Sequence, residues 1–166
     1  MLTGAATGLG PTIDELLTER ADTHTNQVFL RFASGDLTFA EVHDRAARLA
    51  AGLASIGVES GATVPVVMSN SAEFMISLFA LSRLGAVACL INTAFRGPAL
   101  AHAIGVTQAK TVLLDASVVA NLDEIASSLP AELIRIVVGD RWEELAAASP
   151  IPQSSSHSAT DPAIVL

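Results

Sequence analysis

Tyrosine is absent from this chain of 166 residues, cysteine and lysine occur once each, and aromatic residues make up only 4%. The single Cys89 excludes an internal disulfide and a cysteine-based metal cluster, and its apolar neighbours predict a small core residue. Nine basic residues face seventeen acidic ones, for a formal charge of −8, and the basic residues form no cluster. We therefore expect no nucleic-acid partner and no electrostatic binding to anionic lipid.

The first thirty residues lack a basic segment followed by an apolar stretch, so no signal peptide is expected. The most apolar tract, residues 74–91, is long enough to span a bilayer. It contains Arg83, however, which costs about 2.5–3.5 kcal/mol in a membrane-spanning helix, and Gly85 follows. We interpret the tract as a buried helix followed by a buried strand. The prediction is a soluble, cytoplasmic protein that is not an integral membrane protein.

Residues 3–10 fit the pattern TGxxxGxG, which is the phosphate-binding turn of short-chain dehydrogenases. Such a turn must follow a strand and open a helix, yet only Met1 and Leu2 precede it and Pro11 follows at once. The proton-donating Tyr–Lys unit of those enzymes is also excluded, because the chain has no tyrosine. We interpret residues 1–11 as a flexible leader.

Thr38 and Glu41 have the spacing of a capping box, and Leu37 and Val42 have the spacing of a hydrophobic staple. The apolar positions that follow recur three and four apart, which predicts an amphipathic helix over 39–56. Further helices are expected at 13–20, 72–84 (capped by Asn70), 98–105, 118–129 and 141–148. Strands are expected at 28–32, 64–68, 86–91, 110–114 and 133–138, with a turn at 34–36. This alternation predicts an α/β fold, a three-layer parallel sheet with helices on both faces.

Helices and strands alternate over residues 12–148, which we interpret as one α/β subdomain. Residues 149–162 are rich in serine and proline and predict a linker. Residues 163–166 are all apolar and predict the start of a further strand. A native domain rarely ends on exposed apolar residues, so we expect a truncated piece of a longer protein, able to self-associate through the surface exposed by truncation.

No catalytic constellation stands out in the sequence. The histidines have no metal-ligand spacing, and each is expected on a surface or a helix face; they are His24, His43, His102 and His157. The adjacent acidic pairs 123–124 and 143–144 point to different sides of their predicted helices, so neither is an acid–base dyad. The residues alone therefore assign no metal and no catalytic side chain.

Three segments resemble the adenylate-forming (AMP-binding) enzymes, which include acyl-CoA synthetases, peptide-synthetase adenylation domains and luciferases. Residues 37–42 (LTFAEV), with the helix that follows, resemble the first core motif of that superfamily. Residues 70–74 (NSAEF) and 80–91 (ALSRLGAVACLI) resemble its second conserved region. Residues 161–166 (DPAIVL) are similar to the strand before its phosphate loop. The resemblance covers residues 12–166 and implies the N-terminal subdomain of the adenylate-forming fold.

The resemblance implies a parent enzyme that is an ATP-dependent acid–CoA ligase. In this family a carboxylate attacks the α-phosphate of Mg-ATP to give acyl-AMP, and coenzyme A then takes the acyl group. ATP, Mg²⁺ and coenzyme A are thus implied as cofactors of the full-length parent, with a carboxylic acid as substrate. The family's catalytic groups would fall after Leu166, so this chain alone is expected to be inactive and to hold no cofactor.

The residues after Ile91 favour the acid–CoA ligase branch, because they lack the Asp-Pro and Tyr-Pro of amino-acid adenylation domains. By resemblance this loop borders the nucleotide of coenzyme A, and its candidate residues are Asn92, Thr93, Ala94 and Arg96. Arg96 would then meet a phosphate; the alternative is an ordinary exposed loop arginine. The alternative function is a non-catalytic α/β binding or regulatory domain that shares only the architecture.

Overall fold

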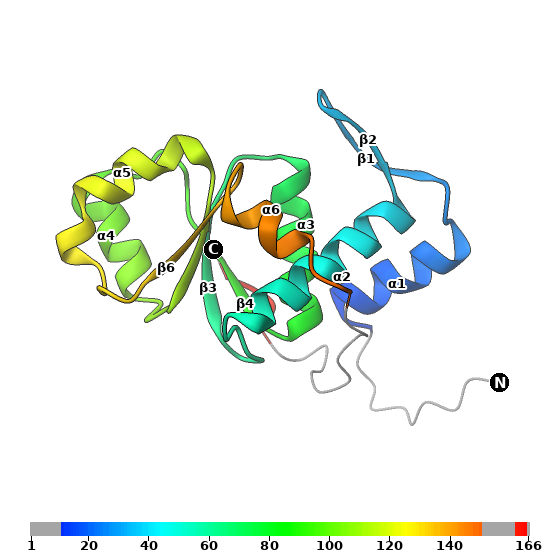
Figure 1. The fold of residues 1–166 in the computed structure, drawn as a ribbon, viewed down its shortest axis with the longest axis horizontal. Helices are drawn as coiled ribbons and strands as arrows, with labels where there is room; N and C mark the ends of the chain where they lie inside the picture. Colours follow the sequence, from blue (N-terminus) through cyan, green and yellow to red (C-terminus); the bar gives the residue numbers. More distant parts are fainter. Residues whose placement is uncertain (1–10, 151–161, 166) are drawn as a thin grey trace.

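The computed structural model describes residues 11–150 and 162–165. At its centre is a five-stranded sheet in the order β6-β5-β3-β4-β7, with all neighbouring strands parallel (Figure 1). The strands are β3 (Thr63–Val67), β4 (Val87–Leu90), β5 (Thr111–Leu114), β6 (Ile134–Val137) and β7 (Ile164–Val165). The predicted parallel sheet is therefore confirmed. The connection from β4 to β5 passes β3, so that β5 pairs with β3 on the side away from β4.

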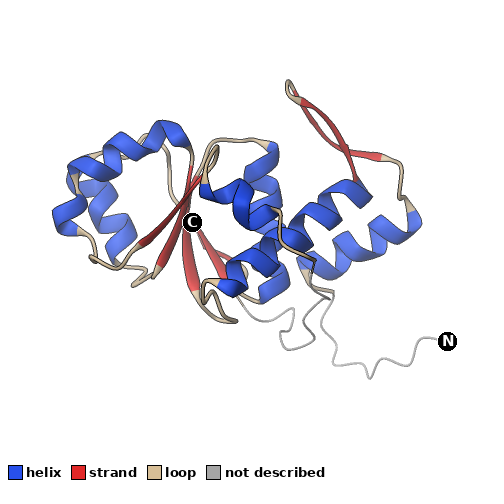
Figure 2. Ribbon diagram, viewed as in Figure 1, coloured by secondary structure: helices blue, strands red, loops and turns tan. Residues whose placement is uncertain are grey.

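Helices cover both faces of the sheet (Figure 2). The helices of one face are α2 (Phe39–Ser55), α3 (Ala72–Leu84) and α6 (Arg141–Ala146); those of the other are α4 (Gly97–Gly105) and α5 (Val119–Glu124). Val66 and Leu113 belong to the first of two apolar cores, and their neighbours Val67 and Leu114 belong to the second. Successive strand residues face opposite ways, so both must be apolar when both faces are covered. The three-layer prediction is confirmed.

A smaller unit made of α1 (Ile13–Thr23) and the hairpin β1 (Val28–Phe32) and β2 (Gly35–Thr38) packs beside the sheet, against α2 and α3 (Figure 1). The turn predicted at 34–36 is wrong. Phe32 pairs directly with Gly35, so the turn occupies 33–34 and the next four residues form a strand. Gly35 has φ 132°, a conformation that favours glycine, and this lets the chain enter the second strand at once.

The capping box that begins α2 is confirmed. Thr38 Oγ1 accepts a hydrogen bond from the Glu41 amide at 3.3 Å, and the Glu41 carboxylate accepts one from the Thr38 amide at 2.8 Å. The prediction that Asn70 caps α3 is wrong by one residue, because Ser71 Oγ accepts from the Phe74 amide at 3.1 Å. Both residue types cap helices well, so composition alone does not decide between them.

Two predicted helices are shorter in the structure than in the sequence analysis. The helix expected at 118–129 is only α5, flanked by the 3₁₀ turns Ala116–Val118 and Ala126–Ser128. The helix expected at 141–148 ends at Ala146. Ser127 and Ser128 weaken helix propensity at the end of the first. The second ends shortly before Pro150, which cannot continue a helix.

The apolar tract 74–91 divides into α3 and β4 as predicted. Within the described ranges, no helix combines the length and apolarity needed to cross a membrane.

Arg83, 3% exposed, donates from Nε to Asp14 Oδ1 at 3.1 Å, and Asp14 is fully buried. Its Nη2 lies 2.7 Å from His43 Nε2. His43 lies on a face of α2, as expected, and there it contacts Arg83; the cluster joins α1, α2 and α3.

Helix α6 packs on the first core through one side-chain hydrogen bond to α3 and through close contact with a glycine of α2. Trp142 Nε1 donates to Ser77 Oγ of α3 at 2.9 Å, and both side chains are buried. A Cβ at Gly52 of α2 would lie only 2.6 Å from the Leu145 Cβ. The absence of a side chain at Gly52 therefore sets how closely α2 and α6 pack.

The described residues cover the predicted subdomain 12–148. The predicted leader and linker lie largely outside them, at 1–10 and 151–161. Of the strand predicted at 163–166, Ile164 and Val165 pair in parallel with Ala88 and Cys89 of β4.

Candidate functional site

The carboxyl ends of the parallel strands define the candidate site. In open parallel sheets, ligands bind where neighbouring strands send their connections to opposite sides. Strand β3 leads into α3 on one face, and its neighbour β5 leads into α5 on the other. The loops after β3, β4 and β5 all emerge at this edge of the sheet.

Asp115, directly after β5, joins two of these loops. Its Oδ2 accepts a hydrogen bond from the Ser69 amide at 2.7 Å, and its own amide donates to the Val67 carbonyl at 3.2 Å. The loop after β3 is thereby held against the end of β5. Asp115 was not predicted from the sequence; the signal was an acidic residue immediately after the buried strand β5.

The loop 92–96 after β4 contains the four candidate residues, and the structure brings them together. Asn92 Oδ1 accepts a hydrogen bond from the Ala94 amide at 2.8 Å. Arg96 Nη1 donates to the carbonyls of Thr93 at 2.6 Å and Phe95 at 2.7 Å. The side chains of Asn92 and Arg96 thus hold the loop in shape. Nη1 of Arg96 makes both of its bonds, and the other guanidinium nitrogens make no hydrogen bond with the described residues.

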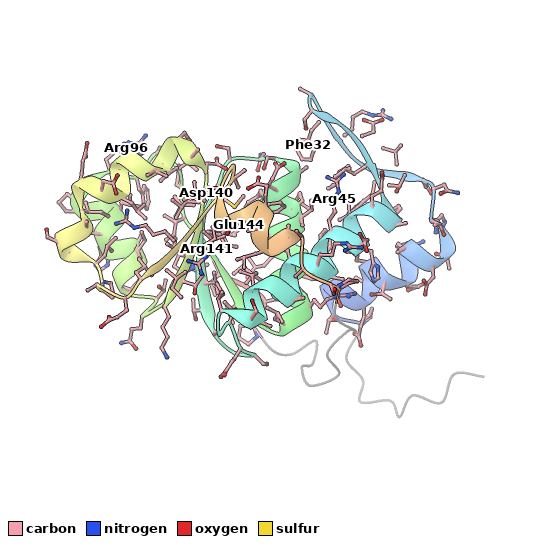
Figure 3. The ribbon with its side chains drawn as sticks, in the orientation of Figure 1. Phe32, Arg45, Arg96, Asp140, Arg141 and Glu144 are labelled. Carbon is pink, nitrogen blue, oxygen red and sulfur yellow. The ribbon has the colours of Figure 1, made fainter. Side chains whose placement is uncertain are left out.

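Arg96 lies immediately before α4, and Figure 3 shows it apart from Asp140 and Arg141, which begin α6. The loop after β6 is closed separately, because both carboxylate oxygens of Glu143 accept from the Gly139 amide, at 3.0 and 2.9 Å. That carboxylate therefore holds the loop after β6 in place.

The groups described at this edge of the sheet are suited to binding an anion. Among residues 11–150 and 162–165, no group of three or more His, Cys, Asp or Glu side chains is placed to hold a metal ion. Burial raises the pKa of the half-buried Cys89 thiol, which keeps it protonated and a poor nucleophile. A guanidinium held in place by two backbone carbonyls suits an anionic group such as a phosphate.

The fold is a three-layer parallel α/β domain whose loops gather at the carboxyl edge of the sheet. The family model described as AMP-binding enzyme matches residues 17–166, so the chain belongs to that family. The resemblance noted in the sequence is therefore confirmed.

Similar proteins include CoA ligases. The medium/long-chain-fatty-acid–CoA ligase FadD6 of Mycobacterium tuberculosis is 30% identical over 94% of this chain and 27% of its own length. The 4-coumarate–CoA ligase 5 of rice (Oryza sativa) is 34% identical over 70% of this chain and 22% of its own. A solved benzoate CoA ligase from Burkholderia xenovorans shares the fold, with a TM-score of 0.85 and 21% identity over 93% of this chain and 32% of its own. The chain thus spans about a quarter of the length of the two sequence relatives.

Proposed function

We propose that this chain is the N-terminal part of an ATP-dependent acid–CoA ligase. The observation that carries the proposal is the family match over residues 17–166, supported by relatives that are named as CoA ligases. In the first half-reaction a carboxylate oxygen of the substrate attacks the α-phosphorus of Mg-ATP, forming acyl-AMP and releasing pyrophosphate. In the second, the thiol of coenzyme A attacks the acyl carbonyl, and AMP leaves as the thioester forms.

The substrate is proposed only as a carboxylic acid. The names of the relatives include fatty acids, coumarate and salicylate. We keep a cytoplasmic location as part of the same proposal.

The part proposed for this chain in the reaction is to border the coenzyme A nucleotide with the loop 92–96. Nη1 of Arg96 is fixed by two backbone carbonyls, so its remaining nitrogens can face a phosphate without further ordering. Asn92 and the Ala94 amide hold the loop in the shape that presents this arginine. ATP and Mg²⁺ are not assigned to the described residues, which offer no acidic cluster for the metal.

The test uses the longest open reading frame that contains these 166 residues. We expect acid-dependent ATP–pyrophosphate exchange from its product, and we predict none from the chain of residues 1–166 alone. An Arg96→Gln variant should raise the KM for coenzyme A while leaving the exchange rate unchanged, because exchange precedes thioester formation. Arg141→Gln, which changes an exposed arginine of α6, is the matched control.

Two results would contradict the proposal. A stop codon directly after Leu166, with a soluble monomer and no exchange, would favour the non-catalytic binding domain. Exchange with an unchanged KM in Arg96→Gln would remove the loop 92–96 from the coenzyme A site while leaving the ligase activity in place. Self-association through residues 163–166 stays a prediction, to be measured by sedimentation of the same samples.

A further inference from the structure

An apolar groove with a volume of about 260 Å³ lies where α1, β1, α2 and α3 meet. Its lining residues are Ile13, Leu16, Leu17, Arg20, Phe29, Phe39 and Phe79. None of them belongs to the loops at the carboxyl edge of the sheet, so the groove is separate from the site described above. Its volume is just below the range of about 300–1,000 Å³ that is common for drug-sized ligands.

Aromatic rings form the wall of this groove. Phe29 and Phe39 stack with their centroids 4.4 Å apart, and Phe79 tilts against Phe29 at 5.8 Å. At the rim, Ile13 and Leu16 are 37% and 44% exposed, although both are large apolar residues. Apolar side chains that gather around a concave surface, rather than lying singly, are typical of a binding site.

The charge at the groove is a single arginine. Ile13, Leu16, Leu17 and Arg20 follow one another at helical spacing, so they share one stripe of α1 and Arg20 stands at its end. With the residues that the structure describes, the Arg20 side chain makes no hydrogen bond or ion pair, and it is exposed.

Three acidic residues of α1 lie within five positions of Arg20. Glu19 precedes it by one position and Asp22 follows it by two, which turns their side chains about 100° and about 200° away around the helix. The Glu15 carboxylate accepts from the Thr12 amide at 2.6 Å, which holds it at the start of α1. Only apolar atoms line the groove, so Arg20 contributes its methylene stem to the lining, and its exposed guanidinium is the cation beside the groove.

We propose that this groove binds an amphipathic carboxylate, with its apolar chain against the three phenylalanine rings and its carboxylate on Arg20. The net charge of −8 repels anions overall, so preference for a carboxylate over a neutral compound of the same length must come from a local cation. The site is additional to the proposed acid–CoA ligase reaction and does not depend on it.

The experiment is a titration of the ¹⁵N-labelled chain of residues 1–166 with octanoate, octanol and octylammonium, each below its micelle concentration. We expect saturable amide shifts on α1 and around Phe79, with octanoate bound about tenfold more tightly than octanol because a charge-assisted hydrogen bond is added. Arg20→Gln should reduce octanoate binding to the level of octanol. Arg31→Gln, an exposed arginine of β1 paired with Asp36, is the matched control and should bind as the wild type does.

Leu16→Glu is the second variant. It puts a carboxylate at an exposed rim position, so it should abolish octanoate binding without lowering the unfolding midpoint. The proposal is overturned if Arg20→Gln binds octanoate as the wild type does, or if octanoate and octanol bind equally. Shifts scattered over the surface would also overturn it, as would shifts at the groove that follow protein concentration without ligand, because a second copy of the chain would then occupy the groove. No ATP or coenzyme A is used, so failure here leaves the ligase proposal unaffected.

Discussion

Removing the carboxylate of Asp14 should be among the most destabilising single changes in the described residues. Asp14 and Arg83 have side chains 0% and 3% exposed and are joined at 3.1 Å. When one partner of a buried ion pair is deleted, the other charge stays buried without compensation, at a cost of about 3–5 kcal/mol. Asp14→Ala should therefore lower the free energy of unfolding by about this amount.

The assay is urea unfolding followed by the fluorescence of Trp142, the only tryptophan, which is 6% exposed. With a urea dependence of about 2 kcal/mol per molar, the midpoint should fall by roughly 2 M. Asp36→Ala is the matched control. It removes the partner of Arg31 from a pair whose side chains are 77% and 42% exposed, and exposed pairs contribute only about 0–1 kcal/mol.

A double variant, Asp14→Leu with Arg83→Met, removes both charges of the pair, so that neither is left buried without its counter-charge. Apolar replacement of both partners of a buried pair is often neutral, so much of the stability should return. Equal effects of Asp14→Ala and Asp36→Ala would refute the reasoning, because burial would then have no influence on the cost.

Three further changes test the structure in other places. Thr38→Ala removes the cap of α2 and should cost about 1 kcal/mol in urea unfolding without changing any ligand affinity; an unchanged midpoint would contradict a structural capping box. Burial and Arg83 lower the pKa of His43, so its contribution to stability is present above the ordinary histidine pKa of about 6.5 and is lost as the pH falls below it. His43→Gln should flatten that part of the stability–pH curve, and a curve that stays as steep would exclude His43 as its source. Gly52→Ala should cost about 1–3 kcal/mol by overpacking against α6, whereas Gly105→Ala, with open space around its Cβ, should be neutral or stabilising.

Much of the fold was predictable because its signals are local. The Thr38–Glu41 spacing, the glycine that ends α3 and the unbroken apolar strands each follow from one short segment. The strand Gly35–Thr38 was missed because four residues of mixed polarity give almost no period. The strand order was not predictable either, since nothing within β5 indicates that it will pass β4 and pair with β3.

The candidate site was predictable only in part, for a similar reason. The loop 92–96 could be proposed from resemblance, and the structure shows the side chains of Asn92 and Arg96 bonded to the loop's own backbone. Asp115 was missed because its role depends on Ser69, which is 46 positions away in the sequence. Parallel strands bring such loops together at one edge, so an acidic residue directly after a buried strand should be examined even when no motif contains it.

The surroundings of Arg83 could be predicted from the sequence only in part. An arginine inside an apolar tract argued against a membrane span, and the same cost of burial requires a counter-charge somewhere in the fold. The counter-charge is Asp14, 69 positions earlier, on a helix whose own pattern gave no reason to select it. Because Asp14 faces Arg83, the rotation of α1 about its axis is fixed, and the stripe that ends at Arg20 is turned toward the groove. The buried pair thus fixes the orientation of α1 and positions the cation on which the proposed carboxylate site depends.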